Sequence, residues 1–189
     1  THLATYTGAA SEYRLAPGAD ELRVPITWTD EQGVTVTKTY VVKPGRYDVQ
    51  VLYDVDNRSA EPWSGTSYVQ LARHVYTPER SMFDVESYAY RGPAIYDGKA
   101  YNKLDITDDE EGKFAQNVTG GWIATMQHHF VTAAVPPKGE DYHFTLGQEG
   151  DHALLTYRGP LKAVPAGTTG RFAETVFVGP KLQEQLKEV

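Results

Sequence analysis

Two adjacent histidines, His128 and His129, stand in the apolar run GGWIATMQHHFVTAAVPP, which extends from Gly120 to Pro137. Imidazoles ligate metal ions and transfer protons, so the pair raises the question of a metal centre or an acid/base site. Neighbouring residues of a strand point to opposite faces, and in an extended segment both rings cannot ligate one ion. No metal-ligand spacing accompanies the pair. We therefore expect a turn or bulge carrying two hydrogen-bonded histidines, and no metal or cofactor.

A catalytic alternative remains open. His128 or His129, together with a carboxylate such as Glu174, would form an acid/base pair able to open or close a sugar ring, as in a carbohydrate-active enzyme or a sugar-binding module. Such chemistry requires the groups to converge in one cleft, whereas an interaction domain requires no convergence. The sequence contains no G-x-S-x-G, no phosphate-binding glycine loop and no H-E-x-x-H motif.

The acidic run DITDDEEG contains Asp105, Asp108, Asp109 and Glu110. A calcium-binding loop counted from Asp105 would need glycine at its sixth position and glutamate at its twelfth. Glu110 and Gln116 occupy those positions, so a calcium site is not expected. These four of the five acidic residues in the run are instead predicted to form an exposed surface available to a partner. The surrounding residues 96–119 are polar and rich in turn formers, which predicts an exposed excursion from the sheets.

Charge and cysteine content exclude several classes of function. Lys and Arg number 18 against 25 Asp and Glu, and the net charge of −7 repels phosphate backbones and anionic head groups. Nucleic acid is therefore not expected as a partner. The chain has no cysteine, which removes disulfides, thiolate metal sites and cysteine nucleophiles. Its 189 residues, 40% of them hydrophobic, predict a single domain over residues 1–189, and no apolar run reaches the roughly 20 residues of a membrane span.

The elements that must position these residues are strands. VTVTKTYVVKPGRYDVQVLYDVDN predicts a long antiparallel hairpin that turns at KPGR, because apolar residues alternate along both arms. Pro25, in the preceding strand, indicates an edge position or a bulge. Further strands are expected around residues 67–76, 85–91, 122–135, 142–146, 153–157 and 171–178. Many strands without intervening helices predict an all-β sandwich.

The last residues, VGPKLQEQLKEV, are the exception and predict a short helix. Pro180 suits a first helical turn, and Leu182, Leu186 and Val189 follow at a spacing that places them on one face. A helix this short is marginal alone and must pack on another element. We therefore assign Pro180, Leu182 and Leu186 a structural role.

Several separated motifs resemble one known family in the same order. They are ELRVPITWTDEQGVTVTKTYVVKPGRYDVQVLYDVDN, then GGWIATMQHHFVTAAVPP followed by a Y-x-F strand, then AVPAGTTGRFAETVFVGPKLQEQL. The chain is similar over nearly its whole length to the large periplasmic domain of the bacterial membrane protein insertase YidC, of the YidC/Oxa/Alb family. The family has further strands before the segment matching Glu21 to Asp30, which implies that the chain is the C-terminal, larger part of that domain.

The resemblance implies a fold, a location and partners. The fold is an all-β, galactose mutarotase-like β-supersandwich of antiparallel sheets with a short C-terminal helix. The domain lies in the periplasm, tethered between the first and second membrane helices of a protein that inserts nascent inner-membrane proteins, alone or with the Sec translocon and SecDF-YajC. It is not an enzyme, and no insertase active residue carries over. Gly120 and Gly121 then permit a tight backbone entry, and the Trp122 indole fills the sandwich.

Overall fold

The computed structural model describes residues 3–75, 90–108 and 110–182, and these form antiparallel β-structure. The chain divides into two compact units. The first comprises Thr1–Ser67 and Leu161–Thr175, and the second comprises Tyr68–Pro160 and Val176–Val189. No helix in the described part of the chain has the length and apolar character needed to cross a membrane.

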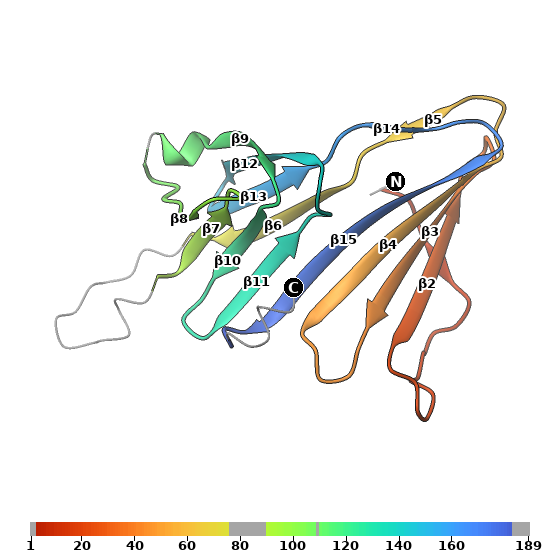
Figure 1. Ribbon diagram of the computed structural model, residues 1–189, viewed down its shortest axis with the longest axis horizontal. Coiled ribbons are helices and arrows are strands. Elements are labelled where there is room, and N and C mark those ends of the chain that lie inside the picture. Colours follow the sequence, from red (N-terminus) through yellow and green to blue (C-terminus); the bar gives the residue numbers. More distant parts are fainter. Residues whose placement is uncertain (1–2, 76–89, 109, 183–189) are drawn as a thin grey trace. The chain divides into compact units, whose positions relative to one another are not determined.

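The first unit contains one large sheet and a two-stranded ribbon (Figure 1). The sheet has the order β1-β2-β3-β4-β15, and the ribbon pairs β14 with β5. The bounds are β1 Thr7–Gly8, β2 Leu22–Thr29, β3 Val34–Val42, β4 Asp48–Asn57, β5 Trp63–Gly65, β14 Lys162–Val164 and β15 Thr168–Pro180. Only residues 168–175 of β15 belong to this unit.

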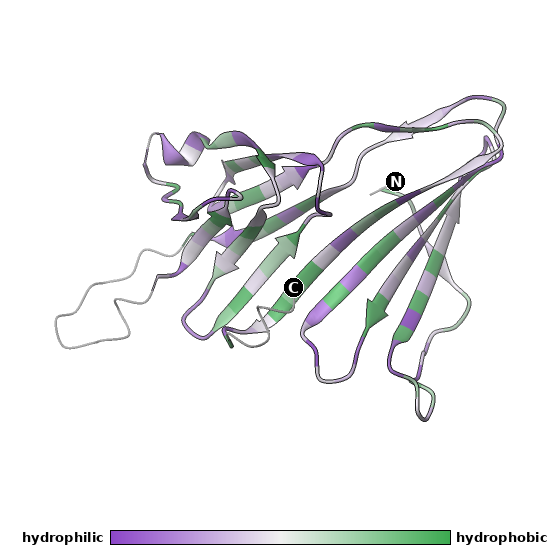
Figure 2. Ribbon diagram, viewed as in Figure 1, coloured by the Kyte–Doolittle hydropathy of each residue, from purple (hydrophilic) through white to green (hydrophobic). Residues whose placement is uncertain are grey.

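The predicted hairpin is confirmed as β3 and β4, which pair from Val34↔Asn57 to Val42↔Val49. Figure 2 shows the alternating hydropathy along these strands. Val34, Val36 and Val55 are buried against Val164 and Phe172. Lys38 interrupts this face, but its ammonium lies 4.9 Å from the centre of the Tyr40 ring and 5.4 Å from that of Tyr53, where cation–π attraction offsets lost hydration.

Asn57 ties the end of β4 to the ribbon. Its side chain is fully buried, and its amide donates to the carbonyl oxygens of Glu61 at 2.9 Å and Val164 at 2.8 Å. Its side-chain oxygen accepts from the backbone and hydroxyl of Ser59. Every polar group of the buried amide is thus satisfied, as burial requires.

The second unit is a sandwich of two antiparallel sheets. One has the order β15-β11-β10-β7-β8, of which residues 176–180 of β15 belong here, and the other has the order β6-β13-β12-β9. The bounds are β6 Tyr68–His74, β7 Gly92–Tyr96, β8 Tyr101–Lys103, β9 Ala115–Thr119, β10 Trp122–Met126, β11 Phe130–Val135, β12 Asp141–Glu149 and β13 His152–Arg158, with a 3-10 turn, η2, at Glu111–Lys113. Both sheets contribute to one core, including Leu71, Ile95, Ile123, Phe144 and Leu155.

Three sequence predictions need correction. Residues 122–135 form the hairpin β10–β11 rather than one strand, because the chain turns at His128 and His129. The 96–119 segment is not wholly an exposed excursion, since it contains β9 and buries Leu104 and Val118 in the core. Pro180 is the last residue of β15 rather than part of a first helical turn. The predicted strand at 85–91 and the helix at 180–189, including Leu186 and Val189, fall largely outside the described residues.

Removal of the Asn57 amide tests the link between β4 and the ribbon. We expect Asn57→Ala to lower the free energy of unfolding by roughly 2–4 kcal/mol, because the Val164 and Glu61 carbonyls lose their donor inside the protein. Thr29→Ala, which removes an exposed hydroxyl pair with Thr35, is the control and should change it by less than about 0.5 kcal/mol. Urea denaturation measures both, and equal effects would contradict the assignment.

Tyr90 provides a pH test of the segment before β7. Its hydroxyl donates to the carbonyl oxygen of Leu104 at 2.9 Å and lies beside that of Pro93. Burial raises the pKa of Tyr90 to about 12. The unfolded chain loses this proton near pH ~10, before the folded chain does, so stability present below that pH falls as the pH rises towards about 12. The free energy of unfolding of Tyr90→Phe should decline less steeply over this range, whereas parallel curves would exclude the assignment.

Candidate binding groove and the placement of the predicted residues

The hairpin β10–β11 has apolar side chains on both of its faces. Ile123 and Ala134 pair with each other and lie in the core between the sheets. The alternate residues point to the other face, where Ala124 pairs with Ala133 and Met126 pairs with Val131. A strand with polar residues on its outer face would be solvated there, but this hairpin presents a second apolar surface.

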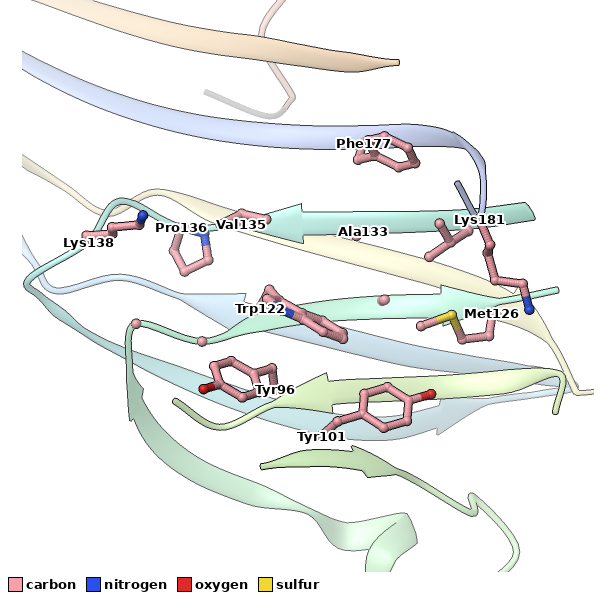
Figure 3. A pocket seen from close by; sticks show the side chains of 14 residues that line it. Tyr96, Tyr101, Trp122, Met126, Ala133, Val135, Pro136, Lys138, Phe177 and Lys181 are labelled. Carbon is pink, nitrogen blue, oxygen red and sulfur yellow. The ribbon is translucent and has the colours of Figure 1, made fainter. Parts of the chain in front are cut away.

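A cavity of about 570 Å³ lies over that second surface. The small side chains of Ala124 and Ala133 leave room between bulkier neighbours, and Phe177 of β15, 1% exposed, packs with them. Figure 3 shows the side chains that surround this space, which we call the apolar groove. Its lining comprises Tyr96, Tyr101, Gly120, Gly121, Trp122, Ala124, Met126, Val131, Ala133, Val135, Pro136, Lys138, Phe177 and Lys181.

Aromatic rings form one wall of the apolar groove. Strand pairing places Trp122 opposite Tyr96, and Tyr96 opposite Tyr101. The Trp122 ring is stacked on Tyr96 with centroids 6.0 Å apart, and its centroid lies 5.9 Å from that of Tyr101. Burial raises the pKa of Tyr101, and a phenol is neutral at ordinary pH even without that shift. The wall therefore offers flat, uncharged surface.

Two charged residues line the apolar groove, and both are lysines. Lys138 and Lys181 lie at opposite ends of the apolar groove in Figure 3. None of the described residues that line the groove is a carboxylate or a histidine. The arrangement suits binding of an apolar ligand, with room for negative charge at its ends.

The glycine pair and Trp122 enter this groove rather than the core. Gly120 has a φ of +70°, which permits the turn into β10. A Cβ on Gly121 would collide with the Tyr96 carbonyl oxygen and Val118 Cγ1, so the backbones approach as closely as glycine allows. Trp122 is half-buried and lines the groove, because it alternates with the core residue Ile123. Its predicted place inside the sandwich is wrong.

His128 and His129 form the turn between β10 and β11. The Gln127 amide donates to the Phe130 carbonyl at 2.8 Å, and the two imidazoles meet edge to face with centroids 4.0 Å apart. The predicted turn is confirmed. The prediction that both rings are hydrogen-bonded is not confirmed, because His128 Nδ1 is buried without a partner among the described residues. In that part of the chain no group of three or more His, Cys, Asp or Glu side chains is placed to hold a metal ion.

Glu174, the suggested catalytic partner of the histidines, does not join them within either unit. It is 2% exposed and belongs to the first unit, whereas His128 and His129 belong to the second. The pairing of either histidine with Glu174 is therefore not assembled inside one compact unit.

The acidic surface is exposed, and its carboxylates shape their own loop. Asp105 accepts hydrogen bonds from the backbone and hydroxyl of Thr107 at 2.9 and 2.7 Å. Asp108 accepts from the amides of Glu111 and Glu110, which lower the pKa of Asp108. Glu110 is exposed, and Asp109 lies outside the described residues. A partner-binding role for this surface stays a prediction.

The fold belongs to the galactose mutarotase-like class. The chain superposes on a galactose mutarotase-like protein from Clostridium acetobutylicum with a TM-score of 0.53 and 8% identity, covering 92% of this chain and 66% of that one. It superposes on the alpha-galactosidase from Lactobacillus brevis with a TM-score of 0.58 and 12% identity, covering 96% of this chain and 27% of that one. Identities this low show the fold alone.

The chain belongs to the YidC periplasmic domain family, whose model matches residues 1–189. It is 37% identical over 177 residues to the membrane protein insertase YidC of Stenotrophomonas maltophilia strain K279a, covering 93% of this chain and 31% of the relative. It is 38% identical over 193 residues to that of Thioalkalivibrio sulfidiphilus, covering 100% of this chain and 34% of the relative. The chain thus spans about a third of the length of these curated relatives.

Substitutions at the two adjacent glycines should separate the positive φ of Gly120 from the close backbone approach at Gly121. We expect Gly121→Ala to lower the free energy of unfolding by roughly 2–4 kcal/mol, because its Cβ meets a backbone carbonyl that cannot move freely. Gly120→Ala meets no atom within 4 Å and should cost only about 1 kcal/mol, the penalty of a positive φ. Gly120→Asn should cost less still, because asparagine tolerates this conformation. Chemical denaturation measures all three, and an equal cost at both positions would contradict the close approach at Gly121.

Proposed function

We propose that residues 1–189 act as a periplasmic interaction domain of a membrane protein insertase and perform no catalysis themselves. The domain is tethered at the periplasmic side of the bacterial inner membrane and helps to insert and fold inner-membrane proteins. It does so alone or with the Sec translocon and SecDF-YajC. The family membership and the names of the relatives support this proposal.

The apolar groove is the main structural support for this proposal, and it suggests how the domain would act. Nascent inner-membrane proteins expose apolar side chains to water before they enter the bilayer, and burial of that surface is favourable by about 25 cal/mol per Å². A cavity of about 570 Å³ has room for a few such side chains. Its aromatic wall, and the absence of acidic side chains from the described lining, match an apolar segment, and transient binding there would shield that segment from water.

A sugar-binding or aldose-epimerase-like role is the second candidate, and Trp122 and Tyr101 favour it because aromatic faces stack on sugar rings. The described lining of the groove holds neither the histidine nor the carboxylate of the acid/base pair considered for ring opening. Its hydrogen-bonding side chains are two phenols, one indole and two lysines, set among mostly apolar residues. Apolar recognition therefore fits this surface better than sugar turnover.

Photo-crosslinking tests the proposed role. The chain replaces the periplasmic domain of the Aeromonas hydrophila relative, to which it is 37% identical, and a photoreactive residue is placed at Met126 in the groove or at exposed Gln116 on β9. We expect a nascent inner-membrane protein to be captured about tenfold more from Met126. Ala133→Leu, which fills the groove floor, should remove most of that excess, because tenfold corresponds to only ~1.4 kcal/mol of binding.

Two results would refute the proposal. One is equal capture from Met126 and Gln116 in the folded hybrid. The other is turnover of an aldose by the chain that disappears in the His128→Gln, His129→Gln double variant, which would support the carbohydrate-active alternative.

A further inference from the structure

The positive charge in the lining of the apolar groove is confined to its two ends. Lys181 lies at the end beside the β10–β11 turn, because its backbone amide donates to the carbonyl oxygen of His129 at 2.9 Å. Lys138 lies at the other end, beyond Val135, the last residue of β11. Figure 3 shows the two lysine side chains on either side of Trp122.

Both ammonium groups are available to a ligand. Lys138 and Lys181 are exposed, and neither ammonium forms an ion pair with another residue that the structure describes. Glu140, the acidic residue nearest to Lys138 along the chain, does not line the groove. Exposed charges separated by more than about 8 Å are largely screened at physiological ionic strength, so the remote part of the net charge of −7 has little effect here.

Strand β11 sets the length of the groove between its two charged ends. Val131, Ala133 and Val135 line the groove along the whole of this strand, which has six residues. At about 3.4 Å for each residue, the strand is about 20 Å long, and an extended peptide segment of about six residues has the same length. Residues that flank such a segment would each reach one lysine.

The middle of the groove disfavours charge. Ala124, Ala133 and Phe177 are at most 8% exposed, so a charged side chain placed over them would lose water without gaining a partner. At the ends, the two lysines attract carboxylates and repel other cations. The pattern that fits the groove is therefore an apolar centre with an acidic residue on each side.

We propose that the groove selects its occupant by flanking charge: it binds an extended apolar segment of about six residues with an acidic residue at each end, and disfavours one flanked by Lys or Arg. This inference rests on the proposed function and adds charge specificity to it. In inner-membrane proteins Lys and Arg concentrate in the cytoplasmic loops. Lys138 and Lys181 thus favour the parts of a nascent protein that belong on the periplasmic side.

The same hybrid insertase, with the photoreactive residue at Met126, tests this selection. Three nascent inner-membrane proteins carry one common apolar segment, flanked on both sides by Asp, by Gln or by Lys. We expect capture of the Asp-flanked segment to be roughly threefold higher than that of the Gln-flanked one, and capture of the Lys-flanked segment roughly threefold lower, because exposed ion pairs are weak.

Charge reversal at the groove ends should invert this order. Lys138→Glu combined with Lys181→Glu should favour the Lys-flanked segment, and the milder Lys138→Gln, Lys181→Gln double variant should make the three segments equal. Lys43→Glu combined with Lys113→Glu is the matched control, because it changes the net charge by the same amount at exposed residues outside the groove. The control should retain the original order.

The outcomes separate this inference from the proposed function. Equal capture of the three segments from Met126, above that from Gln116, would overturn the charge selection and leave the proposed function in place. Capture from Met126 no higher than from Gln116 for every segment would overturn both. An order that changes as much in the control as in the groove variants would assign the preference to net charge and would also overturn the proposal.

Discussion

The close approach of Gly121 to the Tyr96 carbonyl is the constraint from which the apolar groove follows. Because no Cβ separates the two backbones, β10 can begin directly beside the end of β7, in the register that pairs Trp122 with Tyr96. That register brings the indole against both tyrosine rings and completes the wall of the groove. A side chain at residue 121 would displace the start of β10 and move the Trp122 ring away from the two tyrosine rings, although the composition of the core would be unchanged.

The groove also depends on where the hairpin β10–β11 has small residues. Ala124 and Ala133 face each other across the strand pair and are nearly inaccessible, so they form a floor that larger side chains would fill. Apolar surface left open to water weakens the folded state relative to a filled core. A protein that retains such a surface, lined by Trp122 and Met126, gains no stability from it. This cost is consistent with a surface used for binding.

The features that depend on local sequence pattern were predicted correctly. Alternating apolar residues and the KPGR turn predicted the hairpin of β3 and β4, and the glycine pair predicted the tight backbone entry into β10. Trp122 was misplaced because β10 is apolar on both faces, and alternation alone does not say which face meets the core. Tyr101 and Phe177 in the groove come from strands far apart in the sequence, β8 and β15. Pairing register brings them together, and a single sequence carries little signal for that.

Alternation along β11 places its side chains on two faces. Val131 and Ala133 face the apolar groove, whereas Phe130 lines a second cavity, of about 640 Å³, beside the β10–β11 turn. The backbone amide of Lys181, whose side chain lines the groove, donates to the carbonyl of His129, whose ring lines the cavity, at 2.9 Å. This hydrogen bond joins the end of β15 to the β10–β11 turn. Because the Lys181 side chain lines one end of the groove, this bond fixes that end of the groove relative to the β10–β11 turn.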